Sequence, residues 1–325
     1  MERKDFRIVF MGTPEFAVDS LDMLYKAGYN IRAVVTAPDK PAGRGKKLKQ
    51  PEVKRYALEK GIEVLQPVKL KETSFVEKLK SIKPHLGVVV AFRMLPRVVW
   101  SLPEFGTINL HASLLPQYRG AAPINHVLIN GEKETGLTTF FLDEEIDTGK
   151  IILQQKISIG DDEYLDSLHD RMKIAGARLL LETVDLIREG KAKEIPQESM
   201  APGTEKLKPA PKIFKNDCKI EWNLPVRRIY DKIRGLSPFP APFSFLINGD
   251  GEKTLIKIYK AVPEKSAHDL EPGTIVTDNK KYLKVAAADG FVNITELQSQ
   301  GRKRMSADAF LRGFKIEKKM KFETD

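Results

Sequence analysis

The chain is predicted to fold as an α/β protein, with a Rossmann-like, mostly parallel sheet in its N-terminal part and a smaller β-barrel after it. Up to residue 190, predicted strands alternate with predicted helices, as in sheets that helices cover on both faces. Beyond residue 208, short predicted strands follow one another between Gly, Asp and Asn turns, which is typical of a small barrel such as the OB-like type. A length of 325 residues also favours two domains over one.

The first domain is expected to begin with a buried strand over residues 6–12. Thr13 can cap the helix that follows, Pro14 suits its first position, and Gly28 suits its end. Further strands are expected at 31–35, 62–65, 86–91, 107–111 and 137–142, and further helices at 51–60, 73–82 and 162–188. The run at 86–91 is wholly apolar, as expected of a strand that is covered on both faces.

The domain boundaries are predicted from a change in composition. Residues 191–208 combine Pro196, Pro202 and Gly203 with several lysines, as linkers do. We therefore expect a first domain at 1–190, a linker at 191–208 and a second domain at 209–325. In the second domain we expect a helix at 225–234 and strands at 243–247, 254–261, 274–276, 282–287 and 291–297.

Composition and charge favour a cytoplasmic protein with a polyanionic partner. The net charge is +10, and most of the positive excess lies beyond Ala210. No apolar run approaches the roughly 20 residues of a membrane-spanning helix, and the first residues do not have the pattern of a secretory signal. The single cysteine, Cys218, excludes an intramolecular disulfide and a Cys-rich zinc site.

Asn109 and His111 form the sharpest candidate for catalysis. Positions i and i+2 of a strand point to the same side, and here they lie near the carboxyl end, where open α/β sheets bind ligands. An amide can donate to a developing oxyanion and an imidazole can move a proton, which suits acyl transfer. A polar pair that satisfies loop backbone would have the same spacing, so both interpretations stay open.

An acidic cluster of Asp143, Glu144, Glu145 and Asp147 follows the next predicted strand, just before Thr148 and Gly149. One of these carboxylates could orient His111 and stabilise its cationic form. A solvated acidic turn is the alternative. One histidine with scattered carboxylates specifies no particular metal, and we expect none to be required.

A basic segment over residues 38–49 is the candidate for phosphate contact. It carries Lys40, Arg44, Lys46, Lys47 and Lys49 against the single acid Asp39. Alone it could be an ordinary solvated loop. Together with the basic second domain it favours a nucleic-acid partner.

Five segments of the chain resemble the folate-dependent formyltransferase family. They are Phe-Met-Gly-Thr-Pro-Glu-Phe at 10–16, Pro-Ala-Gly-Arg-Gly-Lys-Lys at 41–47, Ile-Asn-Leu-His-Ala-Ser-Leu-Leu-Pro at 108–116, Tyr-Arg-Gly-Ala-Ala-Pro-Ile at 118–124 and Ile-Asp-Thr-Gly at 146–149. The segments at 108–116 and 146–149 are shared by the wider family. The basic segment at 38–49, called the arm from here on, and the second domain are more typical of the branch that modifies tRNA.

The resemblance implies transfer of a formyl group from 10-formyltetrahydrofolate to the α-amino group of methionine on initiator tRNA, for translation initiation. It implies that Asn109, His111 and Asp147 are catalytic. Folate contacts are implied for Phe92, Met94, Leu95, Ser113, Leu114, Leu115 and Pro116. The arm at 38–49 would engage the acceptor end of the tRNA, the barrel would hold the tRNA body, and the protein would be a monomer.

Two positions depart from the family pattern. The family usually has Ala-Tyr-Gly-x-Ile-Leu-Pro in its folate cleft, whereas residues 91–96 are one residue shorter and carry Arg93 near the glycine position. Glu145 also stands where glycine is common. Because neither change touches the catalytic trio, we expect altered folate affinity rather than lost activity.

Three rival functions stay open at this point. One is a formyltransferase for a small molecule, against which the basic arm and the barrel argue. Another is hydrolysis of formyltetrahydrofolate, in which water replaces the amine. The last is a tRNA-binding module with a degenerate site, against which the intact trio argues.

Overall fold

The computed structural model describes residues 1–42, 47–200 and 206–324, which form two compact units. The first unit comprises Met1–Gly120, Glu134–Ser158 and His169–Pro209, and the second comprises Ala121–Lys133, Ile159–Leu168 and Ala210–Asp325. The second unit therefore includes two segments that precede the predicted linker. The predicted boundaries of the functional domains stay a prediction.

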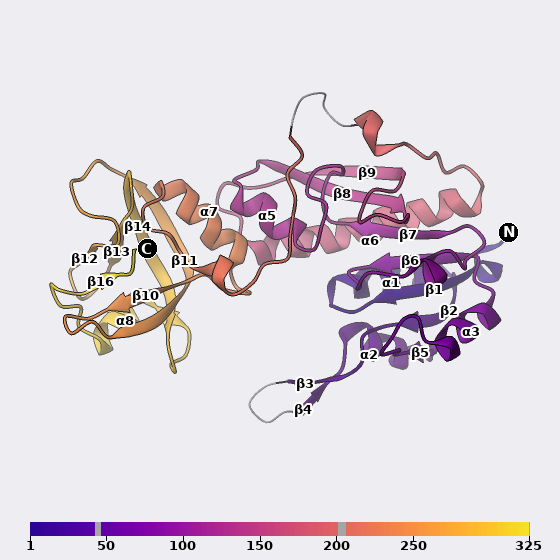
Figure 1. Ribbon diagram of the computed structural model, residues 1–325, viewed down its shortest axis with the longest axis horizontal. Coiled ribbons are helices and arrows are strands. Elements are labelled where there is room, and N and C mark those ends of the chain that lie inside the picture. Colours follow the sequence, from indigo (N-terminus) through magenta and orange to yellow (C-terminus); the bar gives the residue numbers. More distant parts are fainter. Residues whose placement is uncertain (43–46, 201–205, 325) are drawn as a thin grey trace. The chain divides into compact units, whose positions relative to one another are not determined.

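The first unit is built on one seven-stranded sheet (Figure 1), in the order β5-β2-β1-β6-β7-β8-β9. The strands β5, β2, β1, β6 and β7 are parallel, and β8 and β9 are antiparallel to their neighbours. Their bounds are β1 Arg7–Gly12, β2 Asn30–Val35, β5 Val64–Leu65, β6 Leu86–Val90, β7 Thr107–His111, β8 Glu134–Phe141 and β9 Ile151–Ser158. The expected Rossmann-like, mostly parallel sheet is confirmed.

Helices cover both faces of this sheet, as the fold class predicts. They are α1 Phe16–Lys26, α2 Glu52–Glu59, α3 Thr73–Ile82, α4 Arg97–Trp100 and α6 Leu165–Arg188, with the short 3-10 helices η1 Arg3–Asp5 and η2 Gln197–Met200. Residues of α3 and α4 pack with Met11 and Val89 in one cluster. On the opposite face, Gly176 of α6 lies so close to Leu110 that an added Cβ would come within 2.9 Å of its Cδ2.

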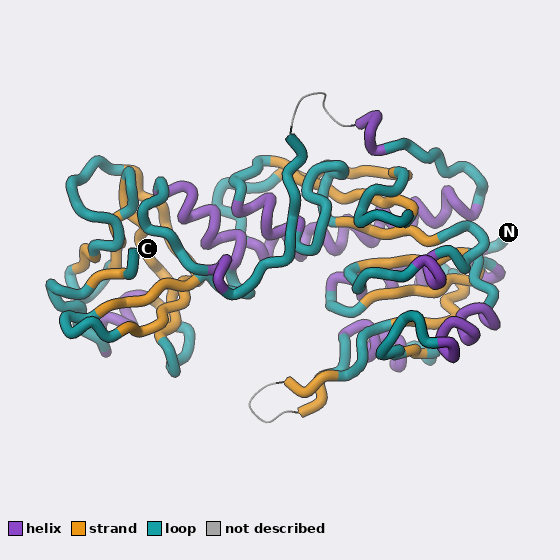
Figure 2. The backbone as a smooth tube through the Cα atoms, in the orientation of Figure 1, coloured by secondary structure: helices purple, strands orange, loops and turns teal. Residues whose placement is uncertain are grey.

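A two-stranded hairpin extends from this unit within the predicted basic arm. Strands β3 Lys40–Ala42 and β4 Lys47–Lys49 are antiparallel, with Lys40 opposite Lys49. Both strands are visible as a separate orange pair in Figure 2. The sequence predicted a loop here, because a proline and two glycines within so short a segment hide the pairing pattern.

The second unit contains an antiparallel sheet in the order β12-β13-β14-β11-β10-β16, with β15 paired to β14. Its strands are β10 Phe243–Ile247, β11 Lys253–Lys265, β12 Ile275–Thr277, β13 Leu283–Ala286, β14 Gly290–Ser299, β15 Met305–Ser306 and β16 Lys321–Phe322. A bridge between Thr274 and Lys321 brings the two edges together, so the sheet forms a nearly closed barrel, as expected. The helices are α5 Pro123–Ile129, α7 Val226–Leu236, α8 Ala307–Gly313 and the 3-10 helix η3 Asn216–Cys218.

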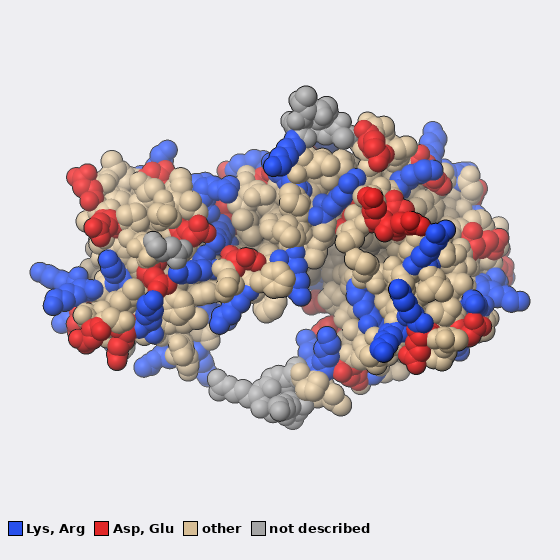
Figure 3. All heavy atoms as spheres, in the orientation of Figure 1, with Lys and Arg blue, Asp and Glu red and all other residues tan. Residues whose placement is uncertain are grey.

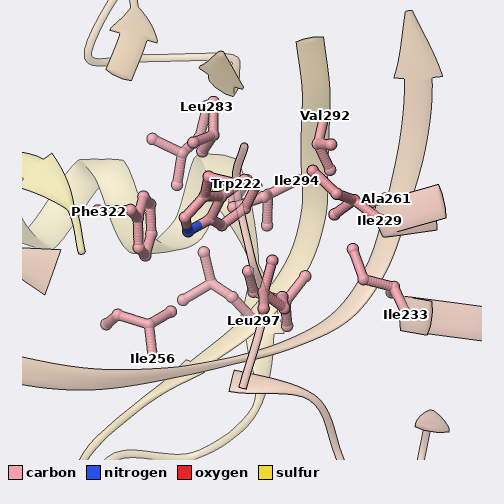
Figure 4. Packing of buried hydrophobic residues seen from close by; sticks show 14 of the residues in the cluster. Trp222, Ile229, Ile233, Ile256, Ala261, Leu283, Val292, Ile294, Leu297 and Phe322 are labelled. Atoms are coloured by element: carbon pink, nitrogen blue, oxygen red, sulfur yellow. The ribbon is translucent and has the colours of Figure 1, made fainter. Parts of the chain in front are cut away.

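Trp222 lies in the core of the barrel (Figure 4), where apolar side chains from several strands surround it. Its ring is fully buried and its centroid lies 5.3 Å from that of Phe322. The indole Nε1 donates to Ser244 Oγ at 2.9 Å, which satisfies the one polar atom that this burial removes from water. The β16 strand is therefore held in place through Phe322 although it is only two residues long.

Several predicted elements need correction. Thr13 does not cap α1, which begins at Phe16 after a turn in which the amide of Ala17 donates to the carbonyl of Pro14 at 3.0 Å. The close approach of Ala17 in this turn requires glycine at position 12, because an added Cβ on Gly12 would lie 2.7 Å from that of Ala17. The strand expected at 137–142 is β8, and the helix expected at 162–188 begins at Leu165. The sequence did not predict β9, α4, α5 and α8, whose exposed edge or short length leaves little periodicity to detect.

Within the described residues, no helix is long and apolar enough to cross a membrane.

Candidate active site

The strand β7 carries Asn109 and His111 on one face of the sheet. Asn109 lies opposite Val89 of β6, whose side chain packs with α3 and α4, so both residues face away from α6. The alternation along the strand gives the opposite face to Leu110, which packs under Gly176. Asn109 is half-buried and His111 is buried, as expected of polar groups at the edge of a core.

The two ring nitrogens of His111 have different partners. Nε2 lies 2.9 Å from the carbonyl oxygen of Tyr118. Because a carbonyl oxygen can only accept, Nε2 carries the hydrogen, and a neutral ring has its lone pair on Nδ1. This nitrogen lies 3.8 Å from Oδ2 of Asp147. The ring nitrogen of His111 that is left as an acceptor therefore lies next to the Asp147 carboxylate.

Asp147 is held from several directions. Its Oδ2 accepts from the backbone amide of Gly120 at 2.9 Å, and its own carbonyl oxygen accepts from Gln197 Nε2 at 2.9 Å. Its backbone has a φ of 56°, in the left-handed region that aspartate adopts more readily than most residues. The structure brings His111 and Asp147 together, with Asn109 two residues along β7, while their catalytic roles stay a prediction.

The other three acids of the cluster belong to an exposed turn. Asp143 Oδ1 accepts from the amide of Glu145 at 3.2 Å and from Thr148 Oγ1 at 2.7 Å, and Glu144 pairs with Arg97 at 2.7 Å. A side chain on Gly149 would place its Cβ 1.7 Å from the carbonyl oxygen of Phe141, which explains the glycine after Thr148. Of the four acids, Asp147 is the one that contacts His111.

The loop after β7 contains four of the predicted folate contacts. Thr138 Oγ1 donates to the carbonyl of Ser113 at 2.7 Å and lies 3.2 Å from the amide of Leu115. Ser113, Leu115 and Pro116 are buried, whereas Leu114 is half-buried and packs against Gly136. These buried residues fix the course of the loop, and their contact with folate stays a prediction.

The segment after β6 contains the other three predicted folate contacts, Phe92, Met94 and Leu95. Leu95 is buried and Phe92 is half-buried, and both pack in the cluster that contains Val89. Met94 is 72% exposed. Arg93 donates to the carbonyl oxygens of Pro67 and Val68 and lies 5.6 Å from the Phe92 ring. The left-handed φ of this segment, 48°, belongs to Ala91, so Arg93 does not have to adopt the backbone angles that favour glycine.

The predicted tRNA contacts of the arm are only partly described. Lys40 and Lys49 are exposed, and Lys49 pairs with Glu52 at 3.0 Å. The backbone of Lys47 pairs with Ala42, while Arg44 and Lys46 lie outside the described residues.

Asp39 anchors the arm at its base. It accepts from Lys54 at 2.7 Å and from Gln66 at 2.8 Å, and these hydrogen bonds hold the pKa of Asp39 below its ordinary value. The single acid of the basic segment therefore has a structural role.

On the face that Figure 3 shows, Lys and Arg side chains are interspersed with Asp and Glu on each unit. The excess of positive charge does not form one continuous basic surface on this face. Among the described residues, no group of three or more His, Cys, Asp or Glu side chains is arranged to hold a metal ion.

Sequence reasoning missed the residues that hold the trio. Tyr118 contributes a backbone carbonyl, which has no signature in the sequence. Gln197 lies 50 residues from Asp147 in a segment whose composition indicated a linker. The segment at 118–124 drew attention only through its resemblance to a family motif.

Comparison with known proteins defines the class of protein. Residues 6–184 match the formyl transferase family, and residues 212–315 match the C-terminal domain of formyl transferases. The chain therefore belongs to the formyl transferase family, and it is a one-carbon group transferase.

Among its relatives is a protein of Bacteroides fragilis named methionyl-tRNA formyltransferase, 54% identical over 99% of both chains. A protein of the same name from Bacteroides thetaiotaomicron is 55% identical over 97% of this chain and 98% of its own length. The crystal structure of WlaRD, a sugar 3N-formyltransferase, covers 92% of this chain and 99% of its own with a TM-score of 0.63. Since its identity is 19%, it supports the fold alone.

Proposed function

We propose that this protein transfers the formyl group of 10-formyltetrahydrofolate to the free α-amino group of methionine carried on initiator tRNA. The observation that carries the proposal is the identity of 54–55%, over nearly the whole length, to proteins named methionyl-tRNA formyltransferase. The product would serve translation initiation. We further propose that the protein acts in the cytoplasm as a monomer.

Asn109 is proposed to bind the oxygen that becomes negative when the amine attacks the formyl carbon. Its amide is half-buried, and it has no hydrogen-bond partner in the part of the chain that the structure describes. A free amide donor on a rigid strand can meet a developing oxyanion without reorganising. The free amide of Asn109 favours this role over the alternative interpretation, in which Asn109 would satisfy loop backbone.

His111 and Asp147 are proposed to move the protons of the reaction. The amine loses a proton when it attacks, and Nδ1 of His111 is the nitrogen that can accept one. Asp147 then stabilises the cation across 3.8 Å and assists delivery of the proton to the leaving nitrogen of the folate. The bond between the folate nitrogen and the formyl carbon breaks, and the bond between the methionine nitrogen and the same carbon forms.

Folate is proposed to supply an activated formyl amide and to bind beside the loop at 113–116 and the segment at 92–95. Met94 and Phe92 offer apolar surface there, which suits the planar ring of a pterin. The arm is proposed to contact tRNA phosphates through Lys40, Arg44, Lys46, Lys47 and Lys49. The barrel is proposed to bind the tRNA body, which its excess of basic residues favours.

An assay with three acceptors tests this proposal. Purified protein and 10-formyltetrahydrofolate are incubated with charged initiator tRNA, with a nucleotide-linked amino sugar, or with no acceptor. We expect formyl transfer to the methionyl-tRNA alone. Transfer to the sugar in preference to tRNA, or rapid formate release without an acceptor, would identify one of the rival activities and overturn the proposal.

A further inference from the structure

Gln197 lies in η2, within the segment whose composition resembles a linker. This segment is attached to the sheet, because Ile195 and Ile151 exchange two backbone hydrogen bonds of 2.8 Å each. Gln197 itself is only 1% exposed. A glutamine is rarely buried to this extent, and its amide must then be paired at both ends.

The amide of Gln197 uses its full hydrogen-bonding capacity. Nε2 donates to the carbonyl oxygens of Asp147 and Gly149, both at 2.9 Å. Oε1 accepts from Nε and Nη2 of Arg119, at 3.1 and 2.6 Å. The two N–H groups of Nε2 meet two carbonyl acceptors, and the two lone pairs of Oε1 meet two N–H donors. The orientation of the amide is therefore fixed. The opposite orientation would set Oε1 against two carbonyl oxygens.

These four bonds connect the two loops that position the Asp147 carboxylate. One loop contains Asp147 itself, whose left-handed backbone costs free energy and persists only where its surroundings hold it. The other contains Arg119, the residue before Gly120, whose amide donates to Oδ2 of Asp147. Gln197 therefore bonds to the backbone of Asp147, which is the acceptor in this contact. It also bonds to the guanidinium of Arg119, which is next to the donor Gly120.

We propose that Gln197 is a positioning residue for formyl transfer, which keeps the Asp147 carboxylate at its distance from Nδ1 of His111. This inference rests on the proposed function, because it requires that Asp147 takes part in the reaction. A displacement of about 1 Å at a reacting group can reduce the rate about 100-fold. Loss of Gln197 should therefore lower turnover, while the proposed contacts with folate and with tRNA stay in place.

The first test compares two substitutions at this position. Gln197→Met keeps the length of the side chain and removes all four hydrogen bonds. We expect kcat to fall about 10- to 100-fold, with KM for tRNA and for folate within about threefold of wild type. Gln197→Glu keeps an acceptor for Arg119 but sets an oxygen against the carbonyls of Asp147 and Gly149, so its kcat should fall at least as far. Wild-type kcat in Gln197→Glu would overturn the inference.

Thr183→Val is the structural control. Thr183 is fully buried in the same unit, and its Oγ1 bonds to the carbonyl of Leu179 at 2.7 Å and to Thr139 Oγ1 at 2.8 Å. Its loss should lower the melting temperature and leave kcat within about twofold. If Thr183→Val lowers kcat as much as Gln197→Met at a similar melting temperature, the effect of Gln197 is general destabilisation and the inference is wrong.

A double-mutant cycle with Asp147→Asn separates positioning from independent effects. If Gln197 acts through Asp147, adding Gln197→Met to Asp147→Asn should change kcat by less than about threefold. Losses that multiply would refute the route through Asp147. Wild-type turnover of Asp147→Asn alone would instead refute the proposed role of Asp147. Turnover lost in Asp147→Asn but kept in Gln197→Met would refute only the inference about Gln197.

Discussion

At the scale of single residues, the site depends on which polar atoms are already satisfied. The carbonyl oxygen of Tyr118 accepts from Nε2 of His111, and the backbone amide of Gly120 donates to Oδ2 of Asp147. The atoms left for chemistry are Nδ1 of the imidazole and the amide of Asn109. Leaving a partly buried polar group such as the Asn109 amide unpaired costs free energy. A bound substrate that pairs with this amide recovers the cost.

Replacement of Asn109 with alanine is the direct test of the oxyanion role. Loss of one donor to an oxyanion typically lowers kcat about 100- to 1000-fold, and we expect a loss in this range for Asn109→Ala. The affinity for charged tRNA, measured on the same variant, should change little because the amide contacts the reacting oxygen. Turnover within a few-fold of wild type would exclude Asn109 from the reaction.

The sequence predicted the pair on β7 for a physical reason. A period of two places residues 109 and 111 on one face wherever a strand forms, and the strand itself was readily predicted. Asp147 could be selected among four neighbouring acids only by resemblance. Gln197 could not be predicted, because its partners are two backbone carbonyls and the side chain of Arg119, which come together only in the completed fold.

At the scale of elements, long and regular segments were predictable and short ones were not. Helix α3 and strand β10 match the predicted ranges residue for residue. Strand β9 escaped detection because three polar residues follow one another at its centre, Gln154, Gln155 and Lys156, of which the last two are exposed. Closure of the barrel depends on the two residues of β16, too few to give any periodicity.

The hairpin arm leads to a prediction about salt. If Lys40 and Lys49 contact tRNA phosphates, each alanine substitution should weaken tRNA binding. It should also reduce the slope of log affinity against log salt by about 0.7 to 1. Lys78 of α3, which pairs with Glu63 at 2.7 Å, offers a matched exposed control whose loss should leave the slope unchanged. Equal slopes for the arm variants and wild type would refute phosphate contact at these lysines.

Helix α7 is fixed by a buried ionic cluster within the second unit. Arg234 is fully buried, and its Nε donates to Asp231 Oδ1 at 2.7 Å. Its Nη1 donates to the carbonyl oxygens of Gly160 and Glu163, at 3.3 and 3.2 Å. The cluster therefore connects α7 to the segment before α6.

Breaking this cluster should cost more than replacing it. Asp231→Leu leaves the guanidinium of Arg234 buried without its carboxylate, so we expect a loss of about 3–5 kcal/mol in the free energy of unfolding. The double variant Asp231→Leu/Arg234→Met removes both charges and should lose less than Asp231→Leu alone. Urea unfolding with constant m-values measures both. A double variant less stable than the single one would contradict a desolvation penalty.

At the scale of the whole molecule, ion pairs that lower carboxylate pKa values occur in both units. Examples are Asp39 with Lys54 in the first unit and Glu323 with Lys219 in the second. Each such carboxylate favours the folded state when ionised. The protein should therefore lose stability in acid through many small contributions, and Asp185 offers the opportunity to isolate one of them.

Asp185 of α6 accepts from Arg3 Nη2 at 2.6 Å and from the Tyr29 hydroxyl at 2.7 Å. Burial tends to raise the pKa of Asp185, but the hydrogen bonds from Arg3 and Tyr29 outweigh it and hold that pKa below its ordinary value of 3.8. Since the folded pKa lies below the unfolded one, the stabilisation is complete well above pH 3.8. It disappears as the pH falls through the folded pKa.

Asp185→Asn should therefore be less stable than wild type by about 1–3 kcal/mol at pH 7. The difference should begin to shrink below about pH 5 and continue to shrink as the pH falls. Urea unfolding from pH 7 to pH 3 measures it without added salt. Asp170→Asn is the control, because Asp170 is 65% exposed in its pair with Lys173, and solvent screening limits its effect to about 0.5 kcal/mol. A difference for Asp185→Asn that stays constant down to pH 3 would mean that the hydrogen bonds stabilise the fold whether or not the carboxylate is ionised.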